Sequence, residues 1–202
     1  LERRYGVSLR ALAEFCERVY GSSDKKARKL ALSVLGFKLE GQVIMRHPGY
    51  GMDDRLMLER INYNDWTVKL DTGVYPLNTT HLPTIDPAEP YRLSSEEQAL
   101  VDEYVDAFED SQSLRRHLNF IYQRGSTYLT CNGNLLYHGC IPLTKDGGFA
   151  QVRHGGKWYS GKALMDYADA VVKSAWVSGE ESALDMMWYL WCGNDSPFSG
   201  RV

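Results

Sequence analysis

The sequence predicts an α+β fold, because helical and strand-like patterns occupy different stretches of the chain. Over the first 125 residues, apolar side chains recur mostly three and four positions apart, the spacing that places them along one face of a helix. After these residues, two short strand-like runs are joined by Asn132-Gly133, the dipeptide most typical of a tight hairpin turn. A second hairpin signal, His154-Gly155-Gly156, precedes two more helical stripes.

Two helices are expected at the start of the chain. Ser8 is predicted to cap the first helix, which ends at Gly21. The second helix carries a longer apolar stripe over residues 27–44. Gly36 and Gly41 lie inside it, and each costs about 1 kcal/mol relative to alanine. We therefore expect another part of the chain to pack closely against these two positions.

The middle of the chain mixes short elements with an irregular stretch. Residues 53–61 are predicted to form a short helix, and a small hairpin is expected near 66–77. Prolines and turn residues make 78–92 an irregular connector. The capping box Ser94–Glu97 then opens one helix and Ser111 opens the next.

The last part of the chain is predicted to contain two strand regions followed by two helices. Strands are expected over 126–141, and a second hairpin over 149–159. Helices are expected over 160–176, with Ser160 as the cap, and over 180–191.

Composition excludes several classes of protein. With 202 residues, 44% hydrophobic and 24% charged, the chain has the composition of a folded protein of one domain, or one domain and a small piece. The longest strictly apolar run, Met186–Cys192, is far shorter than the ~20 residues of a membrane helix. The net charge of -3 and the lack of a basic stripe argue against nucleic acid as a partner.

The cysteines and the chain ends add two expectations. The four cysteines are widely spaced and form no C-x-x-C pair, which favours a reducing, cytoplasmic setting. No secretory signal stands at the start, where Leu1 opens in the middle of a pattern. Both ends look cut, so we expect the chain to be an internal fragment of a longer protein.

His138 is the candidate functional residue. It ends the run Leu135–Tyr137, which is apolar at successive positions and is expected to be a buried strand. Strand ends followed by a loop often carry the chemistry of α/β proteins, and a neutral imidazole there can bind a metal. Gly139 is expected to leave room beside the ring for an ion. A buried core histidine bonded to a backbone carbonyl is the alternative, and the residues alone leave both open.

A zinc site built from His138, Cys131 and Cys140 is not expected. In a two-residue hairpin Cys131 lies opposite Asn134, about four residues from His138 along the ladder, which is roughly 13 Å.

Two other sequence features have ordinary explanations. Residues 156–162 match G-x-x-x-x-G-K, but Ala163 replaces the hydroxyl that holds Mg²⁺, so the match is interpreted as chance. The aromatic patch after Asp185 is expected to be core, with Asp185 as an exposed cap. The pairs Asp53-Asp54 and Glu96-Glu97 are expected to be solvated faces or caps.

Several separate motifs resemble the class III, Firmicutes-type fructose-1,6-bisphosphatases, bacterial enzymes of the calcineurin-like metallophosphoesterase superfamily. The strongest is Asn-Leu-Leu-Tyr-His-Gly-Cys-Ile-Pro at 134–142. Three further stretches support the resemblance and occur in the order expected for the family: residues 54–63, 84–87 and 185–193. The resemblance therefore covers nearly the whole chain.

The resemblance implies part of a metallophosphoesterase α/β sandwich core with a large helical insertion. Residues 1–125 would be the mostly helical insertion, and 126–202 would belong to the core. The other metal motifs of the family, Gly-Asp and Gly-Asn-His-Asp upstream and Gly-His-Thr-Pro downstream, are not found in this sequence. This also points to an internal fragment.

The activity implied is that of a phosphoric monoester hydrolase acting in gluconeogenesis on fructose 1,6-bisphosphate. Two metal ions, expected to be Mn²⁺, would bind the phosphate and lower the pKa of a bridging water. Only His138 matches a metal ligand of the family, and no other catalytic or cofactor-binding residue is assigned. The partner implied is a small sugar bisphosphate, with no nucleic acid and no membrane, and a homo-oligomer is left open. The isolated chain is expected to be inactive.

Two other functions fit the patterns. The helix-rich first 125 residues suit a non-catalytic interaction or regulatory domain equally well. Another metallophosphoesterase, such as a protein phosphatase, is the third hypothesis.

Overall fold

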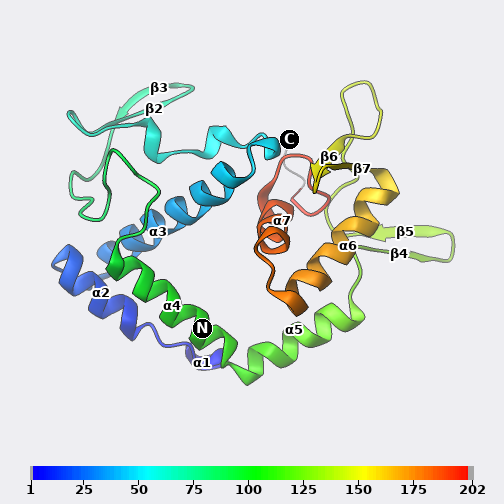
Figure 1. Ribbon diagram of the computed structural model, residues 1–202, viewed down its shortest axis with the longest axis horizontal. Helices are drawn as coiled ribbons and strands as arrows, with labels where there is room; N and C mark the ends of the chain where they lie inside the picture. Colours follow the sequence, from blue (N-terminus) through cyan, green and yellow to red (C-terminus); the bar gives the residue numbers. More distant parts are fainter. Residues whose placement is uncertain (1, 200–202) are drawn as a thin grey trace. The chain divides into compact units, whose positions relative to one another are not determined.

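A computed structural model describes residues 2–199, which form seven α-helices, three short 3-10 helices and seven strands (Figure 1). The strands make three separate antiparallel sheets of three, two and two strands. This mixture confirms the predicted α+β class. Among these residues, no helix is both long enough and apolar enough to cross a membrane.

The described chain divides into two compact units. The first runs to Arg46 and resumes over Asp53–His117. The second contains the short segment His47–Met52 and the chain from Leu118 onward.

The core of the first unit lies among three helices. These are α2 (Arg10–Tyr20), α3 (Lys25–Arg46) and α4 (Ser95–Glu109), preceded by the short α1 (Glu2–Tyr5). The buried cluster that joins the three longer helices consists of Leu12, Phe15, Cys16, Ala31, Leu35 and Leu100. Within α2 and α3 these residues recur three or four positions apart, which places them on one face of each helix, and each large side chain contributes roughly 1.5–3 kcal/mol by burial.

Two of the helix caps predicted in this unit have different outcomes. The capping box is confirmed, since Ser94 Oγ accepts from the Glu97 amide at 3.2 Å and Glu97 Oε2 accepts from the Ser94 amide at 2.8 Å. Ser8 is not the cap of α2, whose N-cap position is Leu9. Its hydroxyl still accepts from the Arg10 amide at 3.1 Å.

The expectation of close packing at the helix glycines is confirmed at one of the two. A Cβ built on Gly41 would overlap the ring of Tyr91, a buried residue of the connector. A Cβ on Gly36 would meet nothing within 4 Å, so the expectation was wrong there.

The predicted helix over 53–61 is wrong. The chain forms two single 3-10 turns, η2 (Asp53–Arg55) and η3 (Leu58–Arg60), and then enters strand β1 (Ile61–Asn62). Pairing of β1 with β2 (Thr67–Leu70) draws the end of this segment into a sheet, so a continuous helix cannot form. The predicted hairpin is present as β2 and β3 (Gly73–Pro76). Residues 77–94 contain no helix or strand, as expected for the connector.

Helix α5 (Gln112–Arg124) leads into the second unit, whose first hairpin is β4 (Tyr128–Cys131) and β5 (Asn134–Tyr137). Asn132 and Gly133 form its turn, with φ of 51° and 74°, and the register is the predicted one.

A second hairpin, β6 (Gln151–His154) and β7 (Lys157–Ser160), turns at Gly155-Gly156. Helices α6 (Gly161–Ser178) and α7 (Glu181–Cys192) follow and pack against each other. Ser160 occupies the N-cap position of α6, but its side chain makes no capping hydrogen bond.

Candidate functional site

His138 follows the last residue of β5 directly and is exposed. Its ring lies 6.2 Å from that of Phe198, centroid to centroid. The predicted position at a strand end is confirmed. The alternative of a buried core histidine is wrong, because the imidazole is open to solvent.

The strand before His138 is not buried, contrary to the prediction. Leu135 and Leu136 are 47% and 54% exposed, and Tyr137 and Leu129 are exposed as well. The strand does carry apolar side chains on both faces, as predicted. Within residues 2–199, however, β4 and β5 form a two-stranded sheet that extends from its unit (Figure 1), so neither face is fully covered.

Gly139 has a different role from the one expected. A Cβ at this position would lie 2.5 Å from the carbonyl oxygen of Pro197 and 2.8 Å from that of Phe198. The Cys140 amide also donates to the Pro197 carbonyl at 3.1 Å. The glycine is therefore needed for the close approach of two backbone segments, and this side of it offers no room for an ion and a phosphate.

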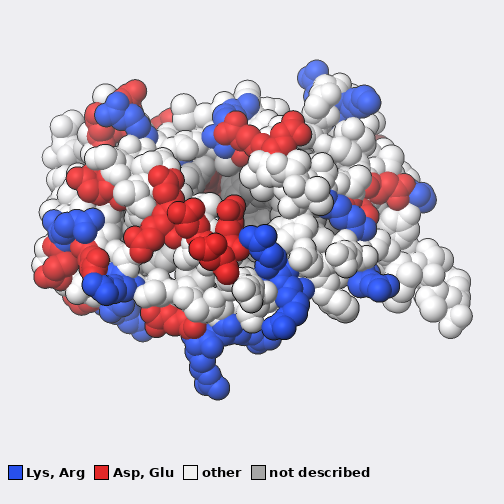
Figure 2. All heavy atoms as spheres, turned by 60° about the horizontal axis from the view of Figure 1, so that its bottom comes forward, with Lys and Arg blue, Asp and Glu red and all other residues white. Residues whose placement is uncertain are grey.

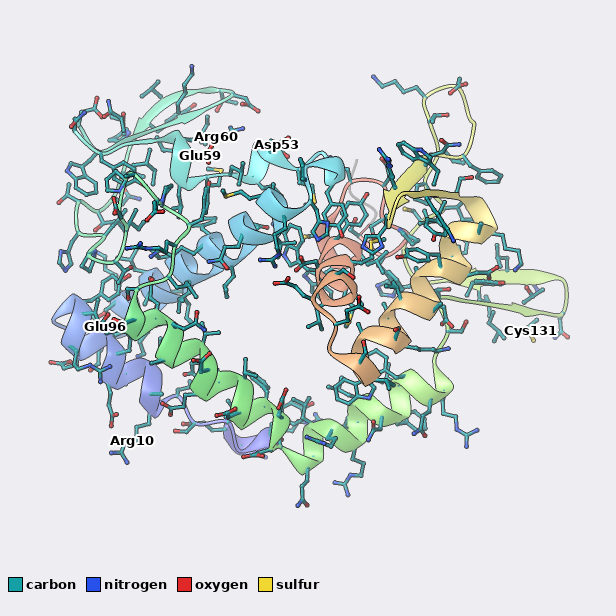
Figure 3. The ribbon with its side chains drawn as sticks, in the orientation of Figure 1. Arg10, Asp53, Glu59, Arg60, Glu96 and Cys131 are labelled. Atoms are coloured by element: carbon teal, nitrogen blue, oxygen red, sulfur yellow. The ribbon has the colours of Figure 1, made fainter. Side chains whose placement is uncertain are left out.

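The described residues do not assemble a complete metal site around His138. No group of three histidine, cysteine, aspartate or glutamate side chains within residues 2–199 has the geometry to hold an ion. Cys131 lies at the tip of the hairpin (Figure 3), at the other end of the ladder from His138. Cys140 is half-buried, and its thiol contacts the Ser196 carbonyl at 3.4 Å. An exposed imidazole suits a single ligand position, but one residue does not make a two-metal centre.

The G-x-x-x-x-G-K match is not a phosphate loop. Lys157–Ser160 is a paired strand, and Lys162 lies in the first turn of α6. Lys162 Nζ is 2.6 Å from Asp166 Oδ2, and this hydrogen bond raises the pKa of the lysine to about 12. A backbone held in a ladder cannot wrap its amides around a phosphate, so the chance interpretation agrees with the geometry.

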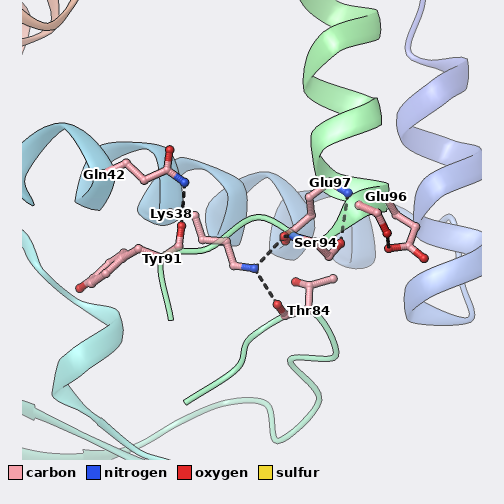
Figure 4. A network of polar contacts seen from close by, with 8 residues as sticks. Lys38, Gln42, Thr84, Tyr91, Ser94, Glu96 and Glu97 are labelled. Atoms are coloured by element: carbon pink, nitrogen blue, oxygen red, sulfur yellow. Dashed lines mark hydrogen bonds and ion pairs between the residues drawn. The ribbon is translucent and has the colours of Figure 1, made fainter. Parts of the chain in front are cut away.

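The structure shows a buried ion pair that the sequence analysis missed (Figure 4). Lys38 Nζ lies 2.6 Å from Glu97 Oε2 and donates to the Thr84 carbonyl at 2.6 Å. Lys38 is 0% exposed and Glu97 is 1% exposed. Glu97 is thus a cap, as expected, but not a solvated one. Its neighbour Glu96 is exposed at the start of α4 (Figure 3), as are Asp53 and Asp54.

The predicted environment of Asp185 was also wrong. It is 4% exposed, not an exposed cap, and its Oδ2 lies 2.9 Å from Nε2 of His47. The rest of the aromatic patch is core in part: Met186, Tyr189 and Leu190 are buried, but Trp191 is exposed. His154, from β6, is a further histidine near His47 that the sequence analysis did not select.

Surface charge is mixed. Figure 2 shows acidic side chains gathered over part of one face with basic side chains beside them. Helix α4 alone exposes four acidic residues in its second half and last turn: Asp102, Glu103, Asp106 and Glu109.

Comparison with known proteins identifies the family. The chain belongs to the Firmicute fructose-1,6-bisphosphatase family, whose model matches residues 22–202. The "Fructose-1,6-bisphosphatase class 3" of Clostridium novyi (strain NT) is 40% identical over all of this chain and 34% of that relative. The proteins of the same name from Porphyromonas gingivalis (strain W83) and Clostridioides difficile (strain 630) are each 42% identical over all of this chain. The match to this chain covers 35% and 34% of the length of these two proteins, respectively.

The chain therefore spans about a third of the length of the curated relatives it matches. No solved structure matches it.

Proposed function

We propose that this chain supplies part of a fructose-1,6-bisphosphatase, a phosphoric monoester hydrolase acting on a sugar bisphosphate in gluconeogenesis. The observation that carries the proposal is the match of residues 22–202 to the bisphosphatase family. Relatives with that name align with the whole chain at about 40% identity. This likeness favours the bisphosphatase over a helical interaction domain or a protein phosphatase.

We further propose that His138 is a ligand of one of two divalent metal ions, with Mn²⁺ as the expected metal. Its exposure at the end of β5 supports this role, because a ligand must be reachable by the ion and its substrate. The remaining ligands would come from parts of the family proteins that lie outside this segment. No catalytic step is assigned to residues 2–199.

Cytoplasmic location is part of the same proposal. None of the four cysteines is in a disulfide within the described chain, as is usual in a reducing compartment, although Cys131 is exposed and accessible to oxidation. The proposed partner is the sugar bisphosphate, and a homo-oligomer is compatible with it.

The test is a segment exchange. The corresponding third of the Clostridium novyi relative is replaced by these 202 residues, and phosphate release is measured with Mn²⁺ on fructose 1,6-bisphosphate and on a phosphopeptide. We expect release from the sugar bisphosphate only. A folded hybrid that hydrolyses only the phosphopeptide, or neither substrate while the parent remains active, would contradict the proposal.

His138 is tested in the same hybrid. His138→Ala should lower bound Mn²⁺ and reduce turnover by about 100-fold or more, since even loss of a residue that supports a ligand costs 10–100-fold. His138→Gln should preserve folding but restore little activity. The matched control is His81→Ala, which removes another exposed histidine. Near-normal turnover and metal content in both His138 variants would refute the ligand assignment.

A further inference from the structure

The segment His47–Met52 is held in the second unit by a cluster of rings. It contains the 3-10 turn η1 (Pro48–Tyr50), and Tyr50 and Met52 are buried. The Tyr50 ring stacks on His47 with centroids 4.7 Å apart and an interplanar angle of 14°. It also contacts Tyr189 of α7 at 4.5 Å, and its hydroxyl donates to Met186 Sδ at 3.9 Å.

Two histidines and one carboxylate form the polar part of this cluster. His47 Nε2 lies 2.9 Å from Asp185 Oδ2, and the Asp185 side chain is only 6% exposed. The ring of His154, from β6, lies 6.1 Å from that of His47 and 6.4 Å from that of Tyr50. His154 Nδ1 is hydrogen-bonded to the hydroxyl of Tyr167 on α6.

The groups around His154 act on its charge in opposite directions. Burial lowers the pKa of His154, and the nearby imidazole of His47 lowers it further. The Ser182 carbonyl and the Asp185 carboxylate oppose this but do not reverse it. Lys157, opposite His154 on β7, adds an exposed positive charge.

The phenols of the cluster do not titrate near neutral pH. Burial raises the pKa of Tyr167 to about 12 and raises the pKa of Tyr50 and of Tyr189 further.

We infer that His154, His47 and Asp185 form an acid-sensitive latch, which docks the segment His47–Met52 while His154 is neutral and releases it when His154 is protonated. One buried carboxylate faces two imidazoles about 6 Å apart. Protonation of His154 would place a positive charge in this half-buried site, next to the His47 ring, and burial disfavours the charged form of an imidazole. Protonation therefore favours the undocked segment, in which both rings reach water.

The direction with pH follows from linkage. The pKa of His154 in the docked state lies below its value of about 6.5 in the exposed state. The stabilisation that neutral His154 gives the docked segment is present above about pH 6.5 and is lost as pH falls through the lowered pKa. The segment should thus loosen between neutral and mildly acidic pH while the helices of the unit stay folded.

The experiment is hydrogen exchange on the 202-residue chain at pH 7.5 and 5.5. Protection factors, which correct for the intrinsic pH dependence of exchange, are compared for two hydrogen-bonded amides of the segment. These are Tyr50, which donates to the His47 carbonyl, and Gly51, which donates to the Pro48 carbonyl. Both should lose protection severalfold at pH 5.5, while amides within α6 and α7 keep theirs.

The variants decide the assignment. His154→Gln keeps polar atoms near Tyr167 and cannot take up a proton, so the acid loss of protection should disappear. His47→Gln should reduce the loss, because it removes the ring that helps to lower the pKa of His154, and it serves if the first variant folds poorly. His81→Gln, in the other unit, should behave like the original chain. Unchanged protection in the original chain at pH 5.5, an undiminished loss in both His154→Gln and His47→Gln, or an equal loss throughout α6 and α7 would each overturn the latch.

Discussion

Replacing Lys38 by methionine should destabilise the first unit strongly. The methionine side chain fills most of the lysine's volume but carries no ammonium, so Glu97 Oε2 and the Thr84 carbonyl both lose the donor that lies 2.6 Å away. The Glu97 carboxylate would remain buried, at 1% exposure, and would keep its hydrogen bond from the Ser94 amide but would have lost the Lys38 cation. Its other oxygen, Oε1, already lacks a hydrogen-bond partner among the described residues.

The magnitude follows from the burial of both partners. Removing one member of a buried pair costs about 3–5 kcal/mol, because the remaining charge is left uncompensated. Solvent screening does not reduce this estimate, because both side chains are essentially inaccessible to water. With a urea m-value of about 1–3 kcal/mol/M, the unfolding midpoint should fall by at least about 1 M.

The assay is urea unfolding followed by circular dichroism, with hydrogen exchange of α3 and α4 to locate the change in the first unit. Lys29→Met, at an exposed position of the same helix, is the matched control and should change stability by less than about 0.5 kcal/mol.

The double variant Lys38→Met with Glu97→Gln separates charge from packing. Glutamine can still close the capping box, so the double variant should be clearly more stable than Lys38→Met alone. If Lys38→Met costs less than about 1 kcal/mol, or if Glu97→Gln gives no rescue, the argument from an uncompensated buried charge is refuted.

Three further predictions concern other parts of the chain. Gly41→Ala should lower the free energy of unfolding in urea by about 1–3 kcal/mol, because its Cβ would overlap the buried Tyr91 ring. Gly36→Ala should raise the free energy of unfolding by about 0.5–1 kcal/mol, because its Cβ meets nothing within 4 Å. Equal effects of the two variants would contradict the packing argument. The exposed apolar hairpin should make the chain self-associate as its concentration rises, which sedimentation velocity measures. Leu136→Lys should reduce the association, whereas Val74→Lys, on another exposed hairpin, should not. A chain that stays monomeric at all concentrations would contradict this prediction. The 202-residue chain alone should release no more phosphate from fructose 1,6-bisphosphate with Mn²⁺ than its His138→Ala variant, and clear activity above that control would show that more of the site is present than one ligand.

Most helices and hairpins could be predicted because their signals are local. The capping box at Ser94 and the Asn132-Gly133 turn each depend on residues within four positions of one another, and both formed as expected. The stretch after Asp53 shows the limit of such signals. A helix was predicted there, but Ile61 and Asn62 pair with a strand farther along the chain, and that tertiary contact decided the outcome.

The polar pairs could not be predicted because they join distant positions. Lys38 and Glu97 are 59 residues apart, and His47 and Asp185 are 138 apart. One local signal was available at Lys38, which lies four positions after the buried Val34 and three before the buried Gly41 and so shares their face of α3. A charged residue on a buried helical face requires a partner of opposite charge, so this spacing could have predicted a buried ion pair without naming Glu97.

The exposed hairpin connects the fold to the proposed function. Its leucines have the pattern of a strand covered on both faces, yet 47–59% of the surface of Leu129, Leu135 and Leu136 is open in this chain. The curated relatives are about three times as long, so in them other segments are available to cover those faces and to contribute ligands beside His138. Burial of the hairpin and completion of a metal site would then be one event, because the residue that ends β5 is also the candidate ligand. In the hybrid that carries these 202 residues, replacing Leu129 and Leu136 by lysine should therefore lower bound metal as well as stability, even though neither side chain can bind an ion. Loss of stability with full metal content would show that the strand and the site are independent.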